Sequence, residues 1–196
     1  MRTPKILFAA AALAVFPLQV LADAQTEAFV EKNANEVLDA LNSPDLDTDG
    51  RTALFSEYME EFADIDAVSR FVIGKYARRF SAAEMKRYQA AFRTYALAVY
   101  ENELDAYRGK AVIVKGSTDR TPTDSIVDTS IPRQDGKAMD VRWRVLKRNG
   151  GYQVVDVALN INGNLIWLAI NQQDQFLALL DQSNGSAWAL INKLES

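Results

Sequence analysis

The chain has 196 residues, of which 48% are hydrophobic and 24% charged, and its formal net charge is −4. It contains neither Cys nor His, which excludes disulfides, thiol nucleophiles, Ser-His-Asp relays and the usual His- or Cys-ligated zinc sites. Its mild acidity makes nucleic acid a poor partner, and we expect neither a metal nor a cofactor.

The first two dozen residues have the pattern of a removable export signal. Arg2 and Lys5 precede the apolar run ILFAAAALAVFPLQVLA, and small residues follow in VLADA. This run is short for a membrane span and contains Pro17. We therefore assign residues 1–24 to a cleavable signal peptide and expect the mature chain in the periplasm, a retained anchor being the weaker alternative.

Residues 25–196 are predicted to form a single domain that begins with helices. Apolar residues recur at helical spacing over 26–42 and 50–62. A third helix follows Asp64 or Asp66, because either side chain can cap it.

The fourth predicted helix is the longest and the most aromatic. It begins at a capping box formed by Ser81 and Glu84 and extends to Gly109. Its apolar residues recur along one face: Tyr88, Phe92, Tyr95, Val99, Leu104 and Tyr107. Such a face either fills an ordinary core or walls a cavity for an apolar ligand, and the pattern alone does not choose between them.

After residue 109 the apolar period changes from about 3.6 to about 2. Four strands are predicted, within 111–116, 125–132, 138–145 and 152–159. In the third, Met139, Val141, Trp143 and Val145 alternate with charged residues, so one face should be dry and the other charged.

The NGG turn at 149–151 should join the last two strands as a hairpin. In the last strand we expect Val155, Val157 and Leu159 on the dry face, and Val154 and Asp156 on the other. Helices near 164–181 and 186–194 complete the chain.

The predicted fold class is α+β. Helices span about 26–109, a four-stranded antiparallel curved sheet spans about 111–159, and the C-terminal helices span about 164–194. A sheet with one dry face needs a cover, for which the aromatic helix is the best candidate. If the sheet curls, a space opens between sheet and helices, which is either filled by side chains or left as a hydrophobic cavity for a ligand.

Two acidic features have functional and structural interpretations. DLDTDG resembles the start of a calcium loop, but the twelfth position is Ser56 instead of Glu, so we favour a polar loop whose last Asp caps the next helix. Asp156 interrupts an apolar strand and, if half-buried, could act as an isomerase base. Without a second catalytic group, we favour Asp156 on the outer face beside an Arg of the neighbouring strand.

Charge is segregated along the middle helices, acidic over 57–66 and basic over 75–93. Ordinary solvated faces explain most of this pattern. The functional alternative is a positive rim for phosphate headgroups or an acidic partner, formed by Lys75, Arg78, Arg79 and Arg93.

The segment FVIGKYARRFSAAEMKRYQAAFRTYALAVYENELDAYRG resembles the periplasmic phospholipid-binding proteins of the MlaC, or toluene-tolerance, family. The matching residues are Gly74, Tyr76, Ser81, Ala91, Phe92, Arg93, Tyr95, Tyr100, Leu104, Tyr107 and Gly109. The strands VRWRV and VVDV and the closing FLALL…NG…ALINKL keep the family's order, so the resemblance covers 65–196. The segment 159–176 departs from it, because it lacks the Ser and Arg usual there.

The resemblance implies an NTF2-like fold whose cavity holds the acyl chains of a phospholipid. It also implies a non-enzymatic carrier that exchanges lipid between an outer-membrane lipoprotein complex and an inner-membrane ABC transporter with an MCE-domain component, which maintains outer-membrane asymmetry. We expect a monomer. Two chains of about fifteen methylenes would cost roughly 20 kcal/mol in water, so a carrier must enclose them.

Twelve residues are expected to line or back this cavity: Phe71, Val72, Tyr76, Phe92, Tyr95, Val99, Val141, Trp143, Val145, Val155, Val157 and Ile166. Three alternatives stay open. The chain could bind another hydrophobic molecule, such as a hopanoid or an aromatic solvent. It could be an isomerase or hydratase built around Asp156, or a structural periplasmic partner with a filled core.

Overall fold

The computed structural model describes residues 24–105, 110–132, 137–148, 150–161 and 163–196. The predicted signal peptide up to residue 23, the end of the predicted aromatic helix at 106–109, and Asn149 of the NGG turn lie outside these residues. Within the described ranges, no helix combines the length and the hydropathy that a membrane span requires.

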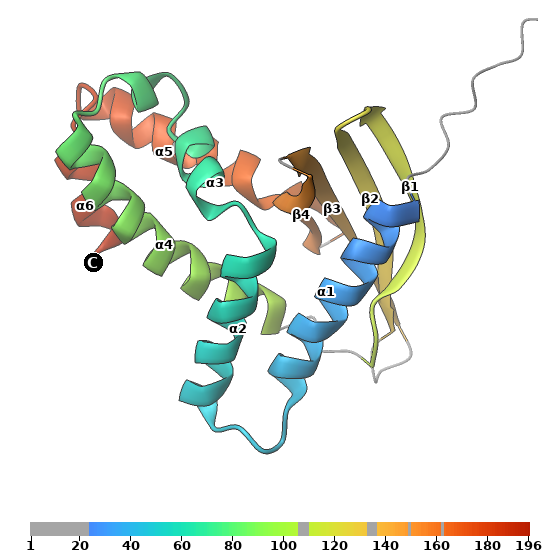
Figure 1. The fold of residues 1–196 in the computed structure, drawn as a ribbon. Coiled ribbons are helices and arrows are strands. Elements are labelled where there is room, and N and C mark those ends of the chain that lie inside the picture. The colour runs from blue at the N-terminus through green and yellow to red at the C-terminus, as the bar shows by residue number, and fades with distance from the viewer. Residues whose placement is uncertain (1–23, 106–109, 133–136, 149, 162) are drawn as a thin grey trace, which may run out of the picture.

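Four α-helices open the described chain, with a short 3-10 helix between the last two (Figure 1). They are α1 (Ala24–Asn42), α2 (Thr48–Phe62), α3 (Ile65–Val72), η1 (Gly74–Arg78) and α4 (Ala82–Asp105).

Local capping explains where three of these helices begin. Asp64 caps α3, since its Oδ1 accepts from the Ala67 N–H at 2.9 Å. The predicted box at α4 is confirmed, with the Ser81 N–H donating to Glu84 Oε2 at 2.8 Å. The cap of α2 differs from the expectation. Asp47, and not the last Asp of DLDTDG, caps this helix, since its Oδ1 accepts from the Gly50 N–H at 2.8 Å.

Five strands form one antiparallel sheet in sequential order, followed by two helices. They are β1 (Ile113–Thr121), β2 (Asp124–Pro132), β3 (Ala138–Arg148), β4 (Gly151–Ile161), β5 (Asn164–Trp167), α5 (Leu168–Gln182) and α6 (Ala187–Leu194).

The expectation of four strands is wrong by one. Residues 164–167, predicted as the first turn of a helix, pair with β4 from Ile161↔Asn164 to Ala158↔Trp167. A short apolar run is compatible with helix or strand. Gly163, with φ of +88°, makes the turn that returns the chain along β4. Pairing with β4 therefore makes residues 164–167 a strand.

A β-bulge in β4 breaks the predicted alternation of side chains. Arg144 pairs with Asp156, whereas the next residue, Val145, pairs with Val154. Val155 is therefore an extra residue in the strand. Val154 is buried with Val145, so the expectation that it shares the outer face with Asp156 is wrong. Asp156 lies opposite Arg144 of β3 as expected. It is buried instead of lying on an open outer face, and Arg144 forms its ion pair with Asp124.

Buried side chains form three clusters. The helical cluster joins α3, η1, α4, α5 and α6; the sheet cluster joins α1 and the strands; the third joins α1 and α2. The expectation that the aromatic helix covers the sheet is wrong, because α1 covers it through Val30, Ala34 and Leu38. Tyr88 and Phe92 of α4 instead pack in the helical cluster.

Candidate functional site

An apolar cavity of about 50 Å³ lies where the three clusters meet. Its wall comes from α1 to α5 and from the strands β3 and β4: Val30, Asn33, Ala34, Val37, Met59, Phe62, Ala63, Ile65, Val68, Phe92, Trp143, Val154, Val155, Asp156, Val157 and Leu168. Only Asn33 and Asp156 in this wall have polar side chains.

The size of the cavity limits what it can hold without movement. A water molecule needs about 10–15 Å³ by this measure, so about 50 Å³ holds a few waters or a few methylene groups. A longer hydrocarbon chain enters only if the walls separate. Ala63 packs against both the helical and the sheet cluster, and the Asp64 N–H donates to Val154 O at 3.1 Å. This hydrogen bond joins the junction of α2 and α3 to β4 beside the cavity.

Four of the twelve residues expected to line or back a cavity lie in its wall: Phe92, Trp143, Val155 and Val157. Val141 and Val145 are buried behind it in the sheet cluster. The structure thus brings together the predicted strand residues and one residue of α4.

The other six predicted residues lie elsewhere. Val72, Tyr76 and Tyr95 belong to the helical cluster. Phe71 is 41% exposed, and Val99 and Ile166 are half-buried outside the wall.

None of the wall residues on α1 and α2 was among the twelve predicted residues. Val30, Ala34 and Val37 recur at helical spacing on one face of α1, which is the signal that could have identified it. Asn33 lies on the same face, between Val30 and Ala34. A polar residue inside an apolar stripe is a local inconsistency of the kind that marks functional positions.

Asp156 caps the first turn of α5 from the neighbouring strand. Its Oδ1 accepts from the Val157 N–H at 2.8 Å and from the Ala169 N–H at 2.9 Å, while Trp167 at the N-cap provides no side-chain bond. Burial raises the pKa of Asp156 to about 6, although these N–H groups and Arg144 act in the opposite direction. The Asp156 carboxylate therefore caps the N-terminus of α5.

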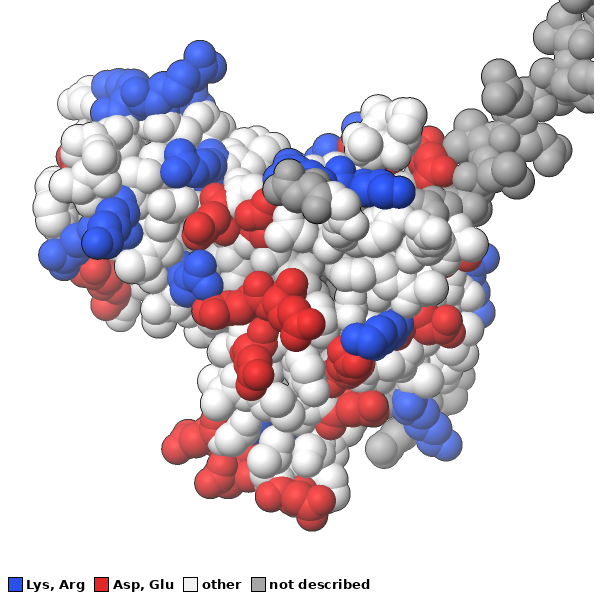
Figure 2. Space-filling view, in the orientation of Figure 1, with Lys and Arg blue, Asp and Glu red and all other residues white. Residues whose placement is uncertain are grey.

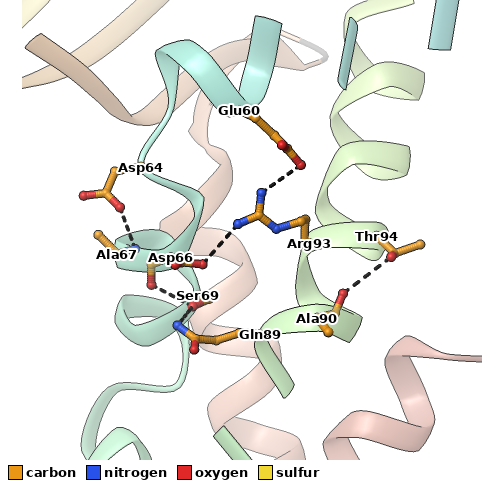
Figure 3. Close-up of polar contacts among 9 residues, drawn as sticks. All are labelled: Glu60, Asp64, Asp66, Ala67, Ser69, Gln89, Ala90, Arg93 and Thr94. Carbon is orange, nitrogen blue, oxygen red and sulfur yellow. Dashed lines mark hydrogen bonds and ion pairs between the residues drawn. The ribbon is translucent and has the colours of Figure 1, made fainter. Parts of the chain in front are cut away.

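The predicted rim cation Arg93 is bound between two helices (Figure 3). Its Nη1 lies 2.8 Å from Glu60 Oε1 of α2, and its Nη2 lies 3.3 Å from Asp66 Oδ1 of α3. Arg93 thus joins α4 to the two helices that carry much of the cavity wall. In the view of Figure 2, acidic side chains gather over the middle and the lower part of the molecule, and many of the basic ones lie toward its left and upper parts.

Two further rim cations surround Tyr76. Lys75 Nζ lies 2.9 Å from Asp181 Oδ1, the Tyr76 hydroxyl donates to the same oxygen at 2.5 Å, and the Arg79 guanidinium lies 4.9 Å from the Tyr76 ring centre. Arg78 is exposed and forms no ion pair with another described residue.

In the described ranges, no group of three His, Cys, Asp or Glu side chains could hold a metal ion.

Comparisons with known proteins give a family and a similar fold. The family model described as MlaC protein matches residues 31–196. A solved structure of a phospholipid-binding protein from Ralstonia solanacearum, in complex with a phospholipid, has a TM-score of 0.73 and covers 86% of this chain and 94% of its own. The two chains are 22% identical, so this similarity concerns the fold. No curated protein matches the chain.

Proposed function

Because the chain belongs to the MlaC family, we propose that it is a periplasmic carrier of phospholipid, exported by the predicted signal peptide. The acyl chains enter the cavity between the helices and the sheet, which curves in the NTF2-like manner, and the headgroup stays near solvent. The carrier exchanges lipid between an outer-membrane lipoprotein complex and an inner-membrane ABC transporter with an MCE-domain component, which maintains the lipid asymmetry of the outer membrane.

The observation that carries this proposal is the composition and position of the cavity wall. Apart from Asn33 and Asp156 the wall is apolar, and it lies between clusters instead of inside one. Separation of the clusters along this junction widens the cavity and leaves the contacts within each cluster in place. Each methylene that enters contributes about 0.8 kcal/mol, so ten methylenes supply roughly 8 kcal/mol toward that movement.

Two further observations support a binding protein over an enzyme. The similar Ralstonia solanacearum protein was solved with a phospholipid bound. Asp156, the residue around which an isomerase would be built, is engaged by the first turn of α5.

Mass spectrometry of organic extracts from the purified protein tests the proposal. We expect phospholipid in stoichiometric amount, and its replacement by another lipid or by nothing would contradict it. Val157→Trp, which places a large ring in the wall, should reduce the bound lipid. The control Ile113→Trp lies on an exposed position of β1 outside the wall and should retain it. Transfer of labelled phospholipid from the loaded protein to the reconstituted inner-membrane complex tests the exchange step.

A further inference from the structure

Asn33 is a buried amide without a hydrogen-bond partner in the described part of the chain. It is 6% exposed and lies in the cavity wall among Val30, Ala34 and Val37. Its side chain forms no hydrogen bond with another described residue. The other polar wall residue, Asp156, differs in this respect, because two backbone N–H groups satisfy its carboxylate.

The Asn33 amide reaches the free space of the cavity, because Gln172 Oε1 is the one side-chain nitrogen or oxygen atom among the described residues that is fully buried without a partner. Water in the cavity can bond the amide while the site is empty, but hydrocarbon that displaces this water leaves the amide unpaired, which costs about as much as a lost hydrogen bond. A Leu side chain has nearly the same branched shape, is a better helix former, and would complete the apolar stripe of α1. The polar residue is explained if the ligand brings the missing partner.

We propose that the Asn33 amide donates a hydrogen bond to an oxygen atom of the bound amphiphile, where its hydrocarbon chain joins its polar part. The inference rests on the proposed function and adds a specificity determinant to it. The amide offers two N–H donors and one acceptor. An ester carbonyl of a diacyl lipid accepts such a bond, and so does the ester of any other long-chain amphiphile.

The position of Asn33 fixes how a ligand would lie. Asn33 belongs to α1, which covers the sheet, whereas Phe92 of α4 belongs to the helical cluster and provides wall from the opposite side. An oxygen held at α1 directs the attached hydrocarbon toward the apolar remainder of the wall. Asn33 therefore sets the depth of insertion, and the cavity discriminates ester-linked chains from chains without a carbonyl.

The test compares ligands that differ only in this carbonyl. Binding of a diester phospholipid and of its diether analogue is measured for the wild-type protein, together with the methyl ester of a long-chain fatty acid and the ether of equal length. We expect the wild type to prefer each ester by about three- to tenfold, the range of a single hydrogen bond. Asn33→Leu should remove the preference, and Asn33→Met provides a second apolar variant that adapts to irregular space.

Controls separate a binding role from a structural one. Asn192→Leu makes the same change on an exposed position of α6 and should keep the preference. Without ligand, Asn33→Leu should melt no lower than the wild type, because the amide forms no hydrogen bond with another described residue that the change would break. A residue needed only for folding would instead lower the melting temperature when replaced.

The possible outcomes test the role of Asn33 and the proposed function separately. An ester preference that Asn33→Leu abolishes supports the inference. Equal affinity of the wild type for ester and ether, or a preference that survives in Asn33→Leu, overturns it. If the wild type binds neither phospholipid but still prefers the methyl ester, the proposed function fails and the role of Asn33 stands. If it binds none of the four ligands, both fail.

Discussion

Replacement of Ala63 by Ile should stabilise the protein and remove its lipid. Ala63 lies in the cavity wall and contacts both the helical and the sheet cluster. Its backbone is extended, with φ of −110° and ψ of 140°, which suits a β-branched residue. The added carbons can fill the free space, and at about 24 cal/mol per Å³ a cavity of about 50 Å³ corresponds to about 1.2 kcal/mol.

This gain should appear as a melting temperature about 2–4 °C higher in a chain of this size. Thermal unfolding followed by circular dichroism measures it, and mass spectrometry measures the lipid that co-purifies. Ala138→Ile, on an exposed position of β3, is the matched control and should change neither. The reasoning would be refuted if Ala63→Ile kept a full complement of lipid, since the filled space would then not be the binding site.

Three other changes test the architecture around the site. Gly185→Ala should lower the unfolding free energy in urea by about 1–3 kcal/mol, because a Cβ there would lie 2.6 Å from Tyr76 Cε1 at a φ of +78°; Gly163→Ala, at a similar φ with nothing within 4 Å, should cost less, and equal costs would exclude the clash. Asp156→Asn should alter the pH dependence of melting: burial raises the pKa of Asp156 from 3.8 to about 6, so its contribution to stability is greatest below pH 4 and is lost as the pH rises through 6, by roughly 3 kcal/mol. A difference in melting temperature between the wild type and Asp156→Asn that stays constant from pH 4 to 7 would contradict this cause. Gln172→Leu should leave the melting temperature unchanged or raise it, because Gln172 Oε1 is buried without a partner in the described residues; a drop of several degrees would show that the amide is bonded.

Local signals allowed much of the fold to be predicted. The Ser81 box, the Asp64 cap and the alternation in β3 depend on residues close together in the chain. β5 was missed because a short apolar run fits either conformation, and only its pairing with β4 distinguishes them. The bulge at Val155 depends on the register with β3, which no local pattern records.

The candidate site was predictable only in part, for a related physical reason. Trp143 and Val157 were identified because a strand's dry face must meet the interior. Which helix meets that face is a matter of tertiary packing. The aromatic residues of α4 were therefore assigned to the sheet, although Phe92 and Tyr95 pack against Phe176 of α5. Asn33 could not be assigned to the wall from the sequence, because the apolar stripe of its helix does not show which element that face meets.

The extra residue in β4 has a consequence for chain length. Loss of one residue at Val155 would restore a regular ladder, with Val154 opposite Val145 and Asp156 opposite Arg144 as they are now. Loss of a residue elsewhere in the strand would turn every side chain beyond it to the opposite face. Since a bulge also bends its strand, relatives with one residue fewer at this point could keep the same inward-facing side chains on a flatter sheet. Natural variation in residue number at this one position would then adjust the width of the binding space without altering its chemistry.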